Sequence, residues 1–379
     1  MPTAAQTRAM DRVNALTGRG LDLITLWREA EEVIAPVVPH YMGTCWFTLD
    51  PASLLITSHY NPFMPELPED ALALEYYADD VHDLAGVARS QAGVSTLHEA
   101  AGGDPSASPR WQANMTMGGD QELIAALRTA HGDTWGALSV YREPGQPTFR
   151  PDEVAFLGAI APALGEGARR ALLLGEARDP EGPGAPGLLV LSSAWEVESA
   201  TPGVERWVSD LPGGDWEAGR LPPAVQAVAG RALRSAEGRD APGEVALARV
   251  LTRSGTWVVL HGASLVSDGA RRVAVIVERA HPARIAPLLM SAYGLTDREQ
   301  EVTRLVLQGE STAGIAERLV VSPHTVQQHL KAIFEKTGVR SRRDLVGKVF
   351  FSHYEPRVRD NEARALAEKP VRGGPWPGS

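Results

Sequence analysis

The sequence contains a single cysteine, Cys45, among 379 residues. One thiol cannot form an internal disulfide, which suits a reducing compartment such as the cytoplasm. A redox-sensing role for Cys45 is the alternative to a plain core residue. No apolar run approaches the roughly 20 residues of a membrane-spanning helix, and no signal peptide precedes the first predicted helix. We therefore expect a cytoplasmic protein that does not enter a membrane.

Lysine is also scarce, because the chain has four and the first of them is Lys331. Upstream of it there can be no phosphate-loop lysine, no kinase strand lysine and no Schiff-base lysine. A large regulator that binds ATP through a phosphate-loop lysine is thereby excluded. A phospho-acceptor receiver domain is excluded too, because its family pattern needs a lysine late in the domain. The histidines show no metal-ligand spacing, and no nucleophile–base pair stands out. We expect no enzymatic activity, no metal and no cofactor.

The net charge of −10 is unevenly distributed along the chain. Residues 295–354 contain nine Lys or Arg and seven Asp or Glu, a balance of +2. Residues 1–294 contain 23 Arg and 36 Asp or Glu, a balance of −13. The acidic part should be repelled from nucleic-acid phosphates and needs another task, for which sensing is the natural candidate.

Residues 295–351 contain the start and stop signals of four short helices, at about 297–308, 312–319, 323–337 and 342–352. Thr296 and Glu299 form a capping box, and Ser322 before Pro323 is an N-cap followed by a residue preset for the first helical turn. Apolar residues recur at intervals of three and four. Only residues 320–322 separate the second and third helices, a spacing that is typical of a helix-turn-helix.

The third of these helices is expected to read DNA bases. Once its apolar positions are removed, one face keeps glutamine and lysine side chains, which can pair with adenine, guanine or phosphate. Hydroxyls and guanidinium groups near helix starts are suited to phosphate contacts. The candidate base-reading residues are Gln327, Gln328 and Lys331, and the candidate phosphate-binding residues are Thr312, Thr325, Arg340 and Arg342. The alternative is a helical protein-interaction domain whose polar face is merely solvated.

This segment resembles the LuxR-type helix-turn-helix of bacterial transcription regulators. The resemblance rests on Leu295-Thr296, Arg298-Glu299, Glu301-Val302, Gly309, Ser311, Ile315-Ala316, Leu319, Ser322, Thr325-Val326, His329, Ile333, Lys336, Gly338-Val339 and Ser341-Arg342. It implies a homodimer bound to a pseudo-palindromic operator in double-stranded DNA, with RNA polymerase as a further candidate partner. It also implies that the fourth helix supplies the dimer contact, through Val346, Val349 and Phe350, whose alternative role is domain core.

Two positions depart from the family pattern. Gln327 stands where the family usually has Lys, and Thr312-Ala313 replaces a usual Asn-Lys or Asn-Arg pair. Losing a cation from the reading helix should lower nonspecific affinity and shrink the salt dependence by about one unit.

The fold class is expected to be multidomain α+β. The order of elements in residues 1–177, which end in a long helix, resembles a GAF sensory α/β domain, and that in residues 187–285 resembles a PAS α+β domain. Residues 178–186 are a Pro/Gly linker, whose G-x-G-x-x-G spacing we reject as a dinucleotide site because prolines forbid the turn. Residues 286–354 form the all-α, four-helix DNA-binding domain, and residues 355–379 form a disordered tail.

Two features of the sensory part can each be interpreted in two ways. The long helix carries Val154, Leu157, Ala161, Leu164, Ala168 and Ala171 at helical spacing, with Pro162 among them. That stripe is either a parallel dimer seam or packing on its own domain. Likewise, Trp195, Trp207, Trp216 and Trp257 either line a ligand cavity or form plain core.

The sequence thus predicts a cytoplasmic, dimeric, sequence-specific transcription regulator whose sensory domains respond to an unknown small ligand or cellular state. The rival prediction is a signalling protein whose helical domain docks a protein partner instead of DNA.

Overall fold

The computed structural model describes residues 2–63, 71–130, 132–173, 186–241, 244–267, 270–280, 293–307, 310–342 and 345. Its contacts divide the chain into two compact units, an N-terminal one reaching Arg279 and a C-terminal one from Ala280 onward. In the described ranges, no helix is both long and apolar enough to cross a bilayer. The mixed α/β architecture with a helical C-terminal region is confirmed, while the GAF and PAS names and the domain boundaries stay predictions.

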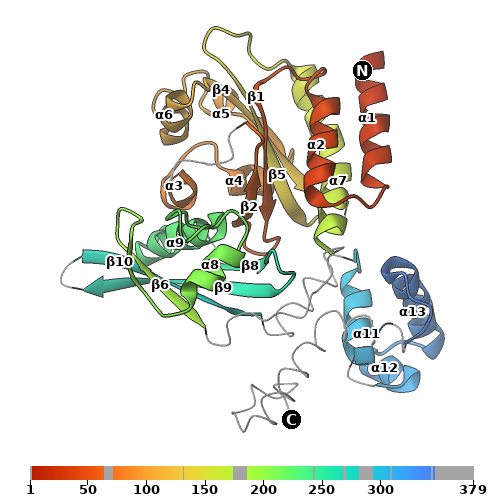
Figure 1. The fold of residues 1–379 in the computed structure, drawn as a ribbon. Coiled ribbons are helices and arrows are strands. Elements are labelled where there is room, and N and C mark those ends of the chain that lie inside the picture. Colours follow the sequence, from red (N-terminus) through yellow and green to blue (C-terminus); the bar gives the residue numbers. More distant parts are fainter. Residues whose placement is uncertain are drawn as a thin grey trace. The chain divides into compact units, whose positions relative to one another are not determined.

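The first half of the N-terminal unit is built on a five-stranded antiparallel sheet in the order β2-β1-β5-β4-β3 (Figure 1). Its strands are β1 (Tyr41–Leu49), β2 (Ile56–Tyr60), β3 (Val94–Thr96), β4 (Gln121–Arg128) and β5 (Thr134–Arg142). All nine residues of the central strand β5 are buried. Both faces of the sheet must therefore be covered.

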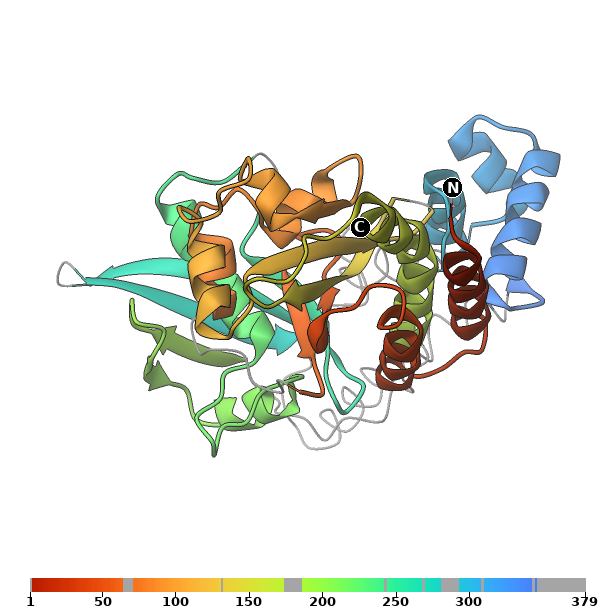
Figure 2. The same cartoon turned by 90° about the horizontal axis from the view of Figure 1, so that it is seen from above.

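Three helices lie side by side on one face of this sheet, as Figure 2 shows. They are α1 (Ala4–Thr17), α2 (Leu23–Ile34) and α7 (Pro151–Leu173). Leu138 and Val140, alternate residues of β5, belong to the apolar core beneath them. The predicted stripe on α7 is part of that core, because Leu157, Ala161, Leu164 and Ala168 are only 0–3% exposed within the single chain. It packs on its own sheet and is not available as a dimer seam.

Four short helices lie on the other side of the sheet: α3 (Ala71–Tyr77), α4 (Leu84–Arg89), α5 (Leu97–Ala100) and α6 (Pro109–Thr116). On this side the Arg110 guanidinium pairs with Glu75 and with Glu122, at 2.6 Å between Nε and Oε2 of Glu122. Asn114 and Tyr141 also donate hydrogen bonds to Glu122, at 2.9 and 3.1 Å. The Arg110 guanidinium thus forms ion pairs with two carboxylates, those of Glu75 and Glu122.

The two carboxylates of this cluster titrate very differently. Burial raises the pKa of Glu75 to about 7, although the charge of Arg110 partly offsets the rise. Burial alone would also raise the pKa of Glu122, but the charge and hydrogen bonds of Arg110 outweigh it and hold that pKa at about 2. Glu75 is therefore the group of the cluster that titrates near neutral pH.

The single cysteine is fully buried, in an apolar core that also contains Ile124 and Tyr141. Burial raises the pKa of the Cys45 thiol to about 12, and Asn61 Nδ2 lies 3.1 Å from its sulfur. Because the thiolate is the reactive form, a thiol this strongly protonated favours the plain-core interpretation over redox sensing.

The second half of the N-terminal unit has its own five-stranded antiparallel sheet, in the order β7-β6-β10-β9-β8. Its elements are β6 (Gly187–Leu191), β7 (Val197–Ala200), α8 (Val204–Asp210), α9 (Pro223–Ala236), β8 (Leu247–Leu251), β9 (Trp257–Ser267) and β10 (Ala270–Arg279). Sequence analysis missed β7, because all four of its residues are exposed and give no alternating pattern.

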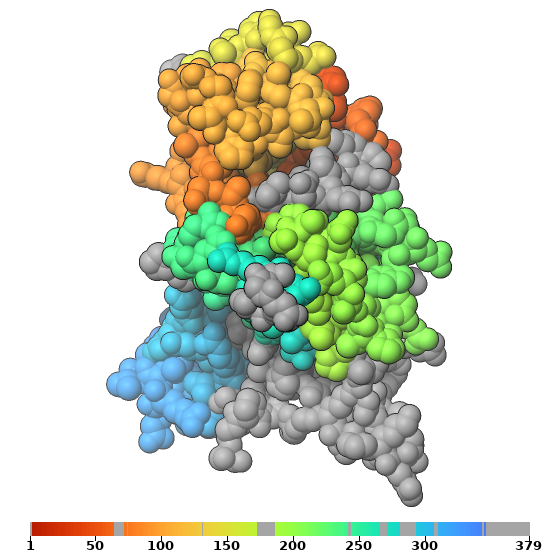
Figure 3. All heavy atoms as spheres, turned by 90° about the vertical axis from the view of Figure 1, so that its left-hand side faces the viewer, coloured from red at the N-terminus to blue at the C-terminus, as the bar shows by residue number. Residues whose placement is uncertain are grey.

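Packing of α9 against α3 joins the two sheets, and Figure 3 shows orange atoms of the first half directly against green atoms of the second. Gly230 of α9 is so close to α3 that a Cβ would stand 2.0 Å from the Ala73 carbonyl oxygen. The buried carboxylate of Asp50, after β1, accepts two hydrogen bonds from the Arg249 guanidinium of β8, at 2.6 and 2.9 Å. Apolar side chains from both sheets form one core. The halves are therefore parts of one body.

The C-terminal unit contains α11 (Asp297–Leu307), α12 (Thr312–Leu319) and α13 (Pro323–Thr337). These bounds agree with the first three predicted helices to within one residue. The predicted fourth helix, 342–352, lies outside the described residues apart from Arg342 and Leu345, which are helical. The apolar stripes meet in one core of Leu295, Val302, Val306, Ile315, Ala316, Val326, Leu330, Ile333 and Leu345.

Gly230→Ala should destabilise the N-terminal unit by about 1–3 kcal/mol, because the added methyl forces α9 away from α3. Urea unfolding followed by tryptophan fluorescence measures this, since eight of the nine tryptophans precede residue 280. Gly158→Ala on α7 is the matched control: its Cβ would meet only the Val94 side chain, at 3.3 Å, and we expect a change within about 1 kcal/mol. Equal effects of the two substitutions would contradict the close α3–α9 contact.

Glu75 should make the N-terminal unit less stable as the pH rises. Its pKa is raised from 4.5 to about 7 on folding, so the folded state binds more protons within that window and stability falls as the pH increases through it. Glu75→Gln should remove this dependence, worth at most about 3 kcal/mol, in urea titrations between pH 5 and pH 8. Glu99→Gln, at an exposed glutamate of α5, should leave the slope unchanged. A wild-type slope that survives in Glu75→Gln would refute the assignment.

Candidate nucleic-acid interface

The turn between α12 and α13 is as short as predicted, with α12 ending at Leu319 and α13 beginning at Pro323. Val320 occupies the left-handed region, at φ 53° and ψ 50°, and is 90% exposed. A β-branched residue rarely adopts this conformation, which glycine or asparagine normally supplies. The backbone N–H of Val321 donates to the Ala316 carbonyl at 2.9 Å and closes the end of α12. The angle between the two helices is thus fixed by backbone contacts.

The N-terminal end of α13 is capped as the sequence predicts. The Ser322 hydroxyl accepts from the Thr325 backbone N–H at 3.0 Å, and Pro323 follows in the first turn. At the other end, Gly338 adopts φ 68° and terminates the helix. The predicted capping box of α11 is also present, because Thr296 and Glu299 each accept a hydrogen bond from the other's backbone N–H.

Two long-range contacts that sequence reasoning missed tie α11 to the other helices. Lys336 Nζ of α13 donates to Glu299 Oε2 at 2.6 Å, and the Arg298 guanidinium donates to the Leu319 carbonyl at 2.6 Å. Burial tends to raise the pKa of Glu299, but the hydrogen bonds from Lys336 and Thr296 more than offset it, and the pKa is lowered. The resemblance included Lys336 and Glu299 as separate positions, and no pattern in the sequence linked them.

All three candidate base-reading residues lie on the exposed face of α13. Gln327, Gln328 and Lys331 are exposed, and the Lys331 side chain is 80% accessible with Glu335 one turn away at 4.0 Å. Gln328 Nε2 lies 3.2 Å from a ring nitrogen of His324, also on that face. The helix therefore presents amide, imidazole and ammonium groups outward while Val326, Leu330 and Ile333 hold it to the core.

The candidate phosphate-binding residues are distributed over two places. Thr312 begins α12, and the Arg342 guanidinium donates to its hydroxyl at 3.1 Å and also to the Glu310 carbonyl. Thr325 lies in the first turn of α13, where its hydroxyl is 2.8 Å from that of Ser322. Arg340 is exposed two residues beyond Gly338. The structure thus brings Thr312 and Arg342 together, a contact that the sequence did not indicate.

The candidate dimer face was predicted at Val346, Val349 and Phe350. These three residues lie outside the described part of the chain. Leu345, just before them, is 1% exposed and belongs to the core of the C-terminal unit.

Comparison with known proteins places this helical segment in a family. Residues 294–349 match the model of bacterial regulatory proteins of the luxR family. A protein of Mycobacterium bovis that is named as an HTH-type transcriptional regulator is 47% identical over 70 residues, which are 18% of this chain and 7% of that protein. The transcriptional regulatory protein DesR of Bacillus subtilis is 37% identical over 65 residues, 17% of this chain and 33% of its own. The chain thus spans a small part of these relatives.

A bacteriophytochrome structure from R. palustris aligns over 74% of this chain and 63% of the phytochrome chain, at 12% identity. The TM-score of 0.29 is too low to assign a fold. The spore germination protein GerE of Bacillus subtilis is 40% identical over 52 residues, which are 14% of this chain and 70% of that protein. Through this match and the family model over residues 294–349, the chain belongs to the LuxR family of bacterial regulatory proteins.

Proposed function

We propose that this chain is a dimeric, sequence-specific DNA-binding transcription regulator of the cytoplasm. The observation that carries the proposal is the outward polar face of α13, which a capped and cross-tied set of helices holds in place. A helix presented in this way is suited to the major groove, where base edges carry a distinct pattern of donors and acceptors.

Within this proposal, different side chains on the face of α13 recognise different groups of the DNA. Gln327 and Gln328 offer carboxamides, which can pair bidentately with adenine, and Lys331 offers an ammonium group for guanine or phosphate. Because Gln327 is neutral, the contribution of this face depends more on hydrogen bonds and less on the release of counterions. Lys331 is then the principal positive charge on the reading face, with Glu335 one turn away.

Phosphate contacts would position the helix without reading sequence. Thr312 and Arg342 form one candidate phosphate site at the start of α12, while Thr325 and Arg340 flank α13. The Arg342 guanidinium is held at the Thr312 hydroxyl, so both side chains would contact the same phosphate. A phosphate there would also meet the free N–H groups of the helix start.

One such helix contacts too few bases for specificity, which supports a dimer on an inverted repeat. We propose Val346, Val349 and Phe350 as the dimer face and RNA polymerase as a downstream partner. The N-terminal unit, with its large negative charge, would be repelled from DNA and is free for sensing a small ligand or a cellular state.

Lys331→Ala should weaken binding of the full chain to random-sequence duplex DNA and reduce the salt slope by about one unit. The side chain is 80% exposed, so the fold should be unaffected, which circular dichroism verifies. Fluorescence anisotropy across a salt series measures both quantities.

Glu335→Ala is the matched control, because it lies one turn away on the same face and removes a negative charge. We expect it to bind DNA at least as tightly as the wild type. If Lys331→Ala left the DNA affinity and its salt slope unchanged, the face of α13 would not contact DNA. The result would then favour the alternative, in which the helical unit docks a protein partner.

A further inference from the structure

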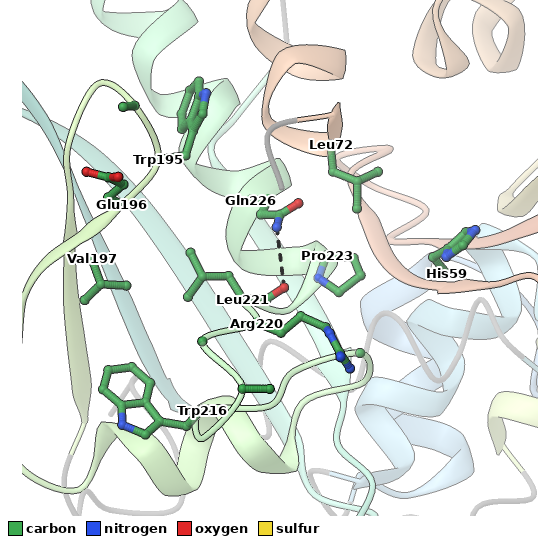
Figure 4. A pocket seen from close by; sticks show the side chains of 14 residues that line it. His59, Leu72, Trp195, Glu196, Val197, Trp216, Arg220, Leu221, Pro223 and Gln226 are labelled. Carbon is green, nitrogen blue, oxygen red and sulfur yellow. Dashed lines mark hydrogen bonds between the residues drawn. The ribbon is translucent and has the colours of Figure 1, made fainter. Parts of the chain in front are cut away.

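A cavity of about 520 Å³ lies within the N-terminal unit, where its two halves meet (Figure 4). His59 of β2 and Leu72 of α3 line it from the first half. The turn before β7 and residues 213–226, which lead into α9, line it from the second half. A volume of this size is suited to a small organic molecule.

The walls of the cavity combine two indole rings and other apolar side chains with polar ones, among them the charged Glu196 and Arg220. Trp195 and Trp216 lie on the side of the second half, and Leu221 and Pro223 lie between them and Leu72 (Figure 4). Trp195 has φ 65°, a conformation that is costly for a residue with a large side chain. Its ring is held edge-on to that of Tyr77 in α3, with 6.2 Å between centroids. The sequence left ligand cavity and plain core open for these tryptophans; Trp195 and Trp216 line the cavity, whereas Trp207 is core.

Two polar side chains of the cavity are poorly satisfied within the described residues. His59 Nε2 is buried and has no hydrogen-bond partner there. Burial lowers the pKa of His59 to about 4, so the imidazole is neutral at pH 7. Gln226 is 8% exposed, and its carboxamide makes one long hydrogen bond, 3.5 Å from Nε2 to the Leu221 carbonyl. Buried polar groups normally find partners, so both sites could gain a hydrogen bond from a bound molecule.

We propose that this cavity is the effector site and that it takes a small aromatic or heteroaromatic molecule with a hydrogen-bonding edge. The ring would lie against Trp195 and Trp216, and the polar edge would meet His59 and Gln226. Rings of this kind attract other rings in stacked or edge-on geometry, beyond the gain from burying their area. The assignment rests on the proposed sensory function.

The location gives such a molecule a way to act. Its walls come from both halves of the unit, and the same Tyr77 that packs on Trp195 donates to Glu237, just after α9, at 3.0 Å. A bound molecule therefore adds contacts across the α3–α9 junction, and it favours whichever arrangement of that junction fits it best.

The fluorescent aromatic anion 8-anilinonaphthalene-1-sulfonate is a suitable probe for the full-length chain. We expect saturable binding of one dye per chain with increased emission. Ala218→Trp, an exposed lining position, should fill the cavity and weaken binding by about tenfold or more, and Trp216→Ala should weaken it by removing one wall. Ala113→Trp, at an exposed alanine of α6, is the matched control and should bind like the wild type.

Dye binding that is equal in Ala218→Trp, Trp216→Ala and the wild type, or that is not saturable in the wild type, would overturn the cavity assignment. Affinity for random-sequence DNA, measured without dye on the same samples, tests the proposed function separately. Loss of dye binding in the cavity variants together with normal DNA binding supports both proposals. If the cavity variants lost dye binding while the wild type kept it, but no sample bound DNA, the cavity assignment would stand and the proposed regulatory function would be refuted.

Discussion

The close packing of α9 on α3 is the constraint on which the N-terminal unit depends. It requires a glycine at position 230, because any side chain there would collide with the backbone at Ala73. With the helices this close, the two sheets share one apolar core, Asp50 can reach Arg249, and residues of both halves line the cavity beside Trp195. Two sheets that could have been separate domains on a linker are instead one body, in which a ligand at the proposed site would contact both halves.

In the C-terminal unit, the packing holds α13 in place and leaves one face of that helix exposed to solvent. The helix caps of this unit and the Lys336–Glu299 and Arg298–Leu319 contacts do not use Gln327 or Lys331 of α13. The remaining polar groups on that face have no structural task in the core. Charge supports the same division, since the acidic residues gather in the N-terminal unit and the reading segment is slightly basic. The proposed sensing and the proposed DNA recognition thus fall on parts of the chain with opposite net charge.

The features that could be predicted from the sequence are those that depend on neighbours three or four residues apart. The caps at Thr296 and Ser322, and the bounds of α11, α12 and α13, follow from such local rules. The left-handed Val320 could not be predicted, because its residue type argues against that conformation. Contacts between distant positions, such as Lys336 with Glu299 or Gly230 with Ala73, carry no local pattern. The cavity depends on both halves meeting, so the tryptophans alone could not distinguish a lining from a core.

Selection of bound sequences from random duplex DNA by the full-length protein, at moderate salt, tests the central claim most directly. A dimer that reads bases through α13 should enrich an inverted repeat whose half-sites lie about ten base pairs apart. Adenine and guanine should recur at the positions within reach of Gln327, Gln328 and Lys331. Recovery of unrelated sequences without any common repeat would contradict the account and would favour a protein partner for the helical unit.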